Sequence, residues 1–228
     1  DGFTIVDRVY AREGGSTNAS CTSVTEHLCI TKAGSATSDI IWKGNGTVII
    51  DGQRARQNGV LVEENYQTID GFIGVNHTLY GAHIDFTRNY VSVLNSTFSD
   101  NGSGGTLDSG LFFNASVSAR AHNNVLLRNN GYGIHLTNNS TGSRILSNNV
   151  VAYNTFNGIY ANTTPNPVII NNVAYGNGGG EFGGGILSAS TGMVSGNISF
   201  GNTGSGLTTG GQSGSTVFMN NISFRNTF

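Results

Sequence analysis

The stretch NVVAYN at residues 149–154 recurs as NVAYGN at 172–177, NISFGN at 197–202 and NISFRN at 221–226. Each copy begins and ends with asparagine and has a strand-like apolar pattern between the two asparagines. The same spacing extends back to Asn124 with Asn129, and to Asn95 with Asp100. A pattern that returns at intervals of roughly 20 to 50 residues is typical of stacked repeats. We therefore interpret the second half of the chain as a solenoid.

A second column consists of a glycine that opens an alternating apolar strand in each unit. Its members, the marker glycines, are Gly59, Gly81, Gly110, Gly133, Gly158, Gly185 and Gly206. The units contain strand and turn patterns but no helical pattern, so one unit corresponds to one coil of a single-stranded parallel β-helix. Stacked amides about 4.7 to 4.8 Å apart can hydrogen-bond to one another, which makes the asparagine columns structural ladders. We predict an all-β fold of about seven or more coils, each of roughly 21 to 29 residues.

The composition suits many strands and tight turns, with 34 glycines, 2 prolines and 11% charged residues. The net charge of −2 provides no basic field, so we predict no nucleic-acid partner. No apolar run approaches the roughly 20 residues of a membrane span, and the chain begins at Asp1 without a signal-like segment. If the protein is secreted, we expect that a leader has been removed.

The N-terminal part differs from the rest of the chain. Residues 1–56 contain both lysines and the only tryptophan and lack a clear period, so we interpret them as a segment that leads into the first irregular coils. Residues 57–228 then form the regular coils of one continuous domain. We predict a disulfide between Cys21 and Cys29, which favours an oxidising compartment; two free thiols are the alternative.

Sequons of the form Asn-x-Ser/Thr are frequent and favour an extracellular or cell-surface location. We predict glycan acceptors on turns or outward strand positions at Asn18, Asn45, Asn76, Asn114, Asn138, Asn139 and Asn162. Further sequons at Asn95, Asn197 and Asn221 fall in the ladders, where we expect the asparagine to be buried.

The motifs VIIDG at 48–52, QNGVLVE at 57–63 and QTIDGF at 67–72, with the NNV and NNI hexads, resemble the right-handed parallel β-helix superfamily of pectin-lyase-like proteins. This superfamily includes carbohydrate-binding and sugar-hydrolase repeat domains and NosD-like surface proteins. The resemblance covers nearly the whole chain. It implies a right-handed coil and an extracellular protein that handles polysaccharide, often an acidic one, as lyase, epimerase, hydrolase or binder. The motifs occupy core and turn positions, so they specify fold rather than activity.

In lyases of this superfamily, a lysine or arginine commonly removes the proton beside the uronate carboxylate, and clustered acidic residues hold a calcium ion. No lysine follows Lys43 in this chain, and the acidic residues of the coils are dispersed. We therefore predict no metal and no cofactor, with calcium as an option that no acidic cluster supports. A polyuronate lyase or epimerase is an alternative to a binding module.

Residues two positions after each marker glycine are predicted to point outward. They form a stripe of aromatic and imidazole side chains with acids and amides beside it. Sugar rings stack on aromatic faces and hydrogen-bond to carboxylates and amides. We therefore predict that a polysaccharide binds to Glu63, His83, Phe112, Asn114, His135 and Tyr160. This interpretation requires the four rings among them to be exposed and to share one face.

If the protein is an enzyme, His83 and Asp85 are the candidate base and orienting acid, and Arg88 the candidate contact for a uronate carboxylate. Packing between coils alone also explains an aromatic stripe. Moreover, the sequons at Asn114 and Asn162 lie on this face, where attached glycans would obstruct a long substrate.

A structural role is a further alternative. Phe224 and Phe228 lie unprotected in the last repeat, and an open end of a parallel solenoid invites stacking. The chain would then be a subunit of a glycosylated extracellular filament or surface layer, assembled by end-to-end self-association.

Overall fold

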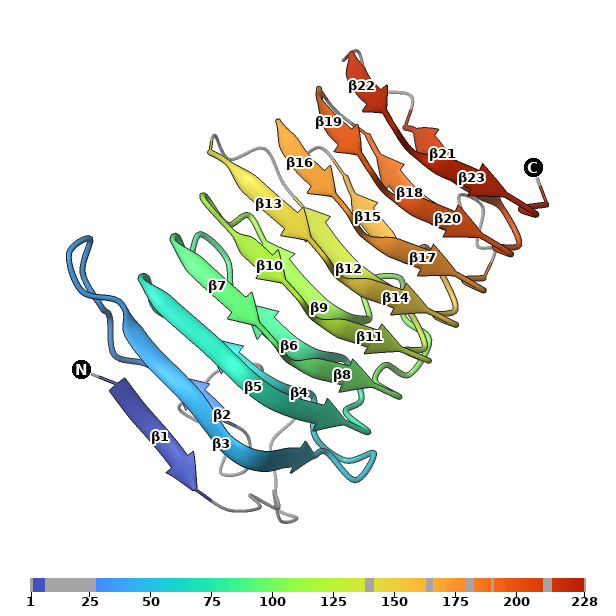
Figure 1. The fold of residues 1–228 in the computed structure, drawn as a ribbon. Coiled ribbons are helices and arrows are strands. Elements are labelled where there is room, and N and C mark those ends of the chain that lie inside the picture. The colour runs from blue at the N-terminus through green and yellow to red at the C-terminus, as the bar shows by residue number, and fades with distance from the viewer. Residues whose placement is uncertain are drawn as a thin grey trace.

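The computed structural model describes residues 2–6, 28–137, 142–162, 166–178, 183–189, 191–210 and 215–227. The regular secondary structure of these residues consists of β-strands alone, from β1 (Gly2–Val6) to β23 (Ile222–Phe224). The strands stack as successive coils along one axis, with the two termini at opposite ends (Figure 1). The predicted all-β solenoid is confirmed. No described segment forms an apolar helix long enough to cross a membrane.

A 15-stranded sheet forms two sides of each coil. After β1, its first run comprises β3 (Ile40–Asp51), β5 (Gln67–Val75), β7 (Val91–Leu94), β10 (Arg120–His122), β13 (Arg144–Ser147), β16 (Pro167–Ile170), β19 (Gly192–Ser195) and β22 (Thr216–Met219). Its second run continues from the ends of β3 and β5 through β8 (Thr97–Ser99), β11 (Val125–Leu127), β14 (Val150–Ala152), β17 (Val173–Tyr175) and β20 (Ile198–Phe200) to β23. Within each run, neighbouring strands pair in parallel.

An eight-stranded parallel sheet forms the third side. It comprises β2 (Leu28–Ile30), β4 (Asn58–Val62), β6 (Tyr80–Ile84), β9 (Ser109–Asn114), β12 (Tyr132–Thr137), β15 (Ile159–Ala161), β18 (Gly184–Ser188) and β21 (Ser205–Thr209). The residue after each marker glycine points inward as predicted, and those from Val60 to Ile186 are fully buried in the core. Because neighbouring coils cover one another's apolar residues, the stack buries a core that one coil cannot.

The asparagine columns form hydrogen-bonded ladders at the two ends of the second run. The Asn149 side chain donates to Oδ1 of Asn172 at 2.9 Å and to the carbonyl of Ala121 at 3.0 Å. Its own Oδ1 accepts from the backbone and side chain of Asn124, both at 3.0 Å. Each ladder amide thus satisfies buried polar groups in both neighbouring coils, so the ladders are structural.

The predicted ladder register is wrong by one residue in the coil that contains Asn95 and Asp100. Both residues have a positive φ, 48° and 59°, and occupy the turn before the ladder. Ser96 and Asn101 take the ladder positions instead, and Asn101 donates to Oδ1 of Asn129 at 3.0 Å. Asn95 is therefore exposed rather than buried, because asparagine is favoured both at a left-handed turn and in a ladder.

The strand β3 is irregular. Its pairing with β5 shifts register between Lys43 and Val48, within the part of the chain expected to hold irregular coils. The proposed division at residues 56 and 57 stays a prediction.

Candidate functional site

The four predicted ring residues share one register on the outward face of the eight-stranded sheet. His83 pairs with Phe112, Phe112 with His135, and His135 with Tyr160 across successive parallel strands. The predicted alignment of the stripe on one face is therefore present in the structure.

The expected exposure of this stripe is wrong for three of the four rings. His83 is 6% exposed, Phe112 4% and His135 2%, whereas Tyr160 is half-buried. The rings stack on one another, with centroids 5.2, 5.0 and 5.1 Å apart along the column. The alternation of the strand identified the outward side chains but did not reveal that they cover one another.

Two tyrosines complete this ring stack. Tyr80 lies against His83 and Phe112, and Tyr132 against His135 and Tyr160, at centroid distances between 4.6 and 4.9 Å. Both precede a marker glycine, a position that alternation alone would turn inward. Because ring faces inside the stack meet other rings, few of them are open to a sugar.

Burial makes the two histidines neutral. It lowers the pKa of His83 to about 4, although the nearby Asp85 opposes that shift, and it lowers the pKa of His135 to about 3. Within the described residues, no ring nitrogen of either histidine has a partner in good hydrogen-bond geometry. The carbonyl of Leu107 lies near His135 and partly opposes its shift.

The three candidate catalytic residues do not form the expected base and orienting acid. The Asp85 carboxylate lies 3.8 Å from Nη2 of Arg88. Among the described residues, neither ring nitrogen of His83 forms a hydrogen bond, to Asp85 or to any other group. Asp85 and Arg88 are half-buried, while His83 is buried in the ring stack. The geometry therefore provides a pair of opposite charges at the surface rather than an activated imidazole.

A column of polar side chains runs beside the ring stack, at the carboxyl ends of the strands. Its members, the polar column, are Glu63, Asp85, Asn114, Thr137 and Asn162, and all are half-buried. The residue directly before each member pairs in register with its equivalent in the neighbouring coil, so the five members are aligned along the axis. Asn114 also pairs directly with Thr137. The Thr137 hydroxyl donates to Oδ1 of Asn114 at 3.3 Å. The polar column thus presents one hydrogen-bonding group per coil over five consecutive coils.

Among the described residues, no three His, Cys, Asp or Glu side chains gather as a metal site. The sequon at Asn45 is exposed, and those at Asn76, Asn114 and Asn162 are half-buried. The sequons at Asn18, Asn138 and Asn139 lie outside the described residues, so all seven acceptors stay predictions.

The predicted disulfide involves one described cysteine. Cys29 lies in β2, and no described cysteine is free. Its predicted partner Cys21 lies outside the described residues, so the pairing stays a prediction.

A second ring stack was missed by sequence analysis. Tyr175, Phe200 and Phe224 lie in register on the outward face of the second run, with centroids 5.1 Å apart and nearly parallel planes. The signal was present in the hexads, whose fourth residue becomes aromatic in the last three copies. These hexads were interpreted only as a ladder pattern.

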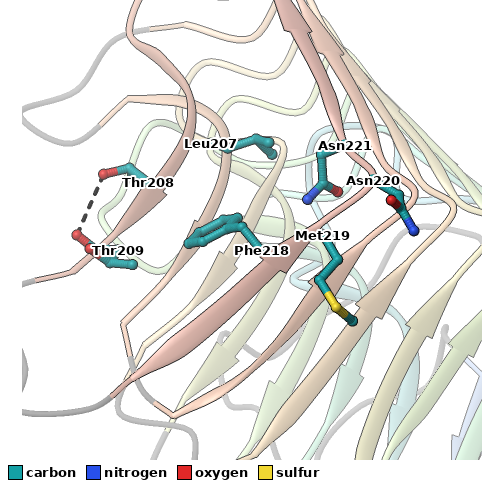
Figure 2. A pocket seen from close by; sticks show the side chains of 7 residues that line it. All are labelled: Leu207, Thr208, Thr209, Phe218, Met219, Asn220 and Asn221. Carbon is teal, nitrogen blue, oxygen red and sulfur yellow. Dashed lines mark hydrogen bonds between the residues drawn. The ribbon is translucent and has the colours of Figure 1, made fainter.

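The last coil contains a hollow of about 540 Å³. Its lining residues are Leu207, Thr208, Thr209, Phe218, Met219, Asn220 and Asn221, as Figure 2 shows. Phe218 pairs in register with Val194, which is fully buried, yet Phe218 itself is 37% exposed. The hollow is therefore the inner side of this coil. End-to-end self-association through such a surface stays a prediction.

The coils, ladders and register define a parallel β-helix protein. A family model described as "Right handed beta helix region" matches residues 109–227, and the chain belongs to this family. Among solved structures, the chain is similar to the crystal structure of pectate lyase Pel9A, with a TM-score of 0.78 and 16% sequence identity. The predicted right-handed pectin-lyase-like fold is confirmed.

The similarity covers 98% of this chain and 61% of the lyase, so the chain spans about three fifths of the lyase's length. At this identity the likeness shows the fold alone. None of the curated proteins matches the chain.

Proposed function

We propose that the chain is an extracellular module that binds polysaccharide along the polar column of the eight-stranded sheet. The observation that carries this proposal is the column itself, which repeats a half-buried polar side chain in five consecutive coils. Neighbouring parallel strands lie about 4.7 to 4.9 Å apart, so the column extends over about 19 Å. A sugar polymer with regularly spaced hydroxyl groups fits such a row of donors and acceptors.

The ring stack supports the column rather than binding the sugar by its faces. Its rings are packed on one another and largely buried, which fixes the strands that carry the polar side chains. This replaces the exposed aromatic platform expected from the sequence. Tyr160, which is half-buried, is the ring of the original four that a ligand can reach most directly.

Two further observations favour this role. The chain shares its fold with a protein named as a pectate lyase, and pectate is a polysaccharide. The sequons and the predicted disulfide support an extracellular setting. Binding is favoured over a lyase or epimerase reaction because His83 is 6% exposed and Asp85 pairs with Arg88 rather than with the imidazole.

The test is glycan binding by a double variant, Asn114→Ala with Thr137→Val, made in a host without N-glycosylation. The variant removes two adjacent polar groups, and at about 1 kcal/mol for each lost hydrogen bond we expect affinity to fall about tenfold or more. Isothermal titration calorimetry against polygalacturonate, its methyl ester, alginate and a neutral glucan would measure the change. The same samples would be assayed for unsaturated uronate products.

The matched control is Thr68→Val with Ser92→Ala. These residues pair in register on the first run of the other sheet and are also half-buried. Unchanged affinity in the Asn114 variant, or an equal loss in the control, would contradict the proposal. Product formation that disappears in His83→Ala while binding persists would instead favour the enzyme.

A further inference from the structure

One aromatic ring beside the second ring stack has a different orientation from the rest. Tyr153 meets Tyr175 at a centroid distance of 5.1 Å and an interplanar angle of 80°, whereas the planes of Tyr175 and Phe200 differ by 5°. Stacked rings cover one another's faces and expose mainly their edges. Tyr153 is turned out of that arrangement and is 59% exposed, so one of its faces is open to solvent.

The ring of Tyr153 packs over a glycine in the next coil. A Cβ atom at Gly176 would lie 2.7 Å from both Cδ1 and Cε1 of Tyr153, a distance that real contacts do not allow. In the coil after that, a Cβ at Gly201 would meet no atom within 4 Å. The Tyr153 ring, which covers Gly176, and the bare backbone of Gly201 therefore form a flat strip, which we call the shelf.

The shelf belongs to a column of left-handed turn residues that follow the second run. Tyr153, Gly176 and Gly201 each donate a backbone N–H to the carbonyl that ends the run in the next coil. All three have φ between 56° and 63°, as does Arg225 nearby at 53° in the following coil. Side chains at this turn point away from the core, which is why glycine here leaves open surface.

The charges at the two ends of the shelf differ. Before Tyr153, Arg128 donates to both carboxylate oxygens of Asp100 at 2.9 and 2.7 Å, so its charge is compensated. After Gly201, Arg225 is exposed and forms no ion pair with any described residue. Two coils separate Gly176 from Arg225, a distance of about 10 Å at the usual strand spacing.

We propose that the shelf is a second carbohydrate-binding site, which takes two neighbouring sugars of an acidic polysaccharide. The apolar face of one pyranose packs on the open face of Tyr153, and the chain continues over Gly201. The carboxylate of the next sugar then accepts hydrogen bonds from the Arg225 guanidinium, the donor best matched to a carboxylate. Charge complementarity selects an acidic glycan as the occupant, and the flat strip without side chains selects a ring-shaped one.

This site is independent of the polar column, because it lies on a different side of the coil. Binding at the shelf and binding at the column are therefore separable. In the double variant of Asn114 and Thr137, the shelf is expected to keep its affinity.

The first experiment follows the backbone amide signals of Gly176 and Gly201 by NMR during titration with a galacturonate hexamer. In the wild type, we expect both signals to shift with the bound fraction. Tyr153→Asn removes the ring while keeping a residue that tolerates the left-handed turn. Gly201→Asn places a side chain on the open strip, and asparagine again tolerates the positive φ of this turn. We expect each variant to weaken binding at these signals about tenfold.

The matched control is Tyr90→Asn. Tyr90 has φ 57°, close to the 56° of Tyr153, and is 48% exposed, but it lies at a different turn and stacks on Tyr66. We expect this variant to bind as the wild type does. Wild-type affinity in Tyr153→Asn and Gly201→Asn, or an equal loss in Tyr90→Asn, would overturn the proposal.

A second comparison tests the role of Arg225. The methyl ester of the same hexamer has the same rings without charge, so Arg225→Gln should weaken binding of the acid several-fold and leave binding of the ester unchanged. Raising the salt concentration should reduce the advantage of the acid in the wild type, because the ion pair is exposed. An equal effect of Arg225→Gln on both ligands would contradict carboxylate recognition.

Discussion

At the scale of single residues, the two buried histidines show how strongly this fold changes ordinary side chains. His135 lies between Phe112 and Tyr160, with Tyr132 also against its ring. A charged imidazole in this stack would lose its hydration without gaining a partner, so burial lowers its pKa to about 3. The sequence predicted an accessible histidine here. Two of its three ring neighbours, Phe112 and Tyr160, come from other strands, which strand alternation does not place.

This low pKa predicts a loss of stability in mild acid. Between pH 6.5 and pH 3 the unfolded chain binds a proton at His135 that the folded chain does not bind, so the free energy of unfolding falls as pH falls. For this residue the loss amounts to about 2 kcal/mol between pH 7 and pH 5. We expect His135→Phe to remove that part of the pH dependence, as measured by urea denaturation at both pH values.

Tyr160→Phe serves as the control, because it changes the same ring stack without changing a histidine. We expect it to keep the wild-type pH dependence. A wild-type pH dependence in His135→Phe would show that His135 does not remain neutral in the folded protein.

At the scale of single elements, the marker glycines explain how closely neighbouring coils approach. A Cβ at Gly133 would lie 2.4 Å from the carbonyl oxygen of Gly158, and one at Gly59 would lie 2.4 Å from that of Gly81. The column therefore marks a close contact between backbones rather than only the start of a strand. This reason could not be derived from the sequence, because the repeat shows where glycine recurs but not which atom excludes a side chain.

Gly133→Ala should consequently destabilise the protein by about 1 to 3 kcal/mol, the usual cost of overpacking, because the obstructing atom is backbone. Gly201→Asn is the comparison, since a Cβ there meets nothing within 4 Å and asparagine tolerates its positive φ. We expect that variant to stay within about 1 kcal/mol of the wild type. Guanidinium denaturation of the two variants would measure the difference, and equal losses would contradict the steric explanation.

At the scale of the whole molecule, the fold was predictable because one signal repeats. Asparagine columns, marker glycines and inward apolar residues all follow the period of the coil, so an error such as the shift at Asn95 did not alter the architecture. The candidate site was less predictable. Tyr153 and Gly176 both take the fifth position of their hexads, and they form the shelf only because that position changes from tyrosine in one coil to glycine in the next. The repeat predicts that these two positions stack, but not that the ring of one lies over the backbone of the other.

The same stacking predicts that stability varies along the axis. A central coil is covered on both sides, and its inward residues Leu126 and Ile134 are fully buried. In the last coil the inward residue Phe218 is 37% exposed. Since solenoid stability is approximately a sum of nearest-neighbour terms, the amides of β11 and β12 should exchange with solvent more slowly than those of β22 and β23. Hydrogen exchange measured by mass spectrometry on the 228-residue chain would test this. Uniform protection from β11 to β23 would mean that the coils unfold only together, or that the last coil is covered by another molecule. Repeating the measurement at tenfold lower protein concentration separates these two cases, because only protection by self-association decreases on dilution.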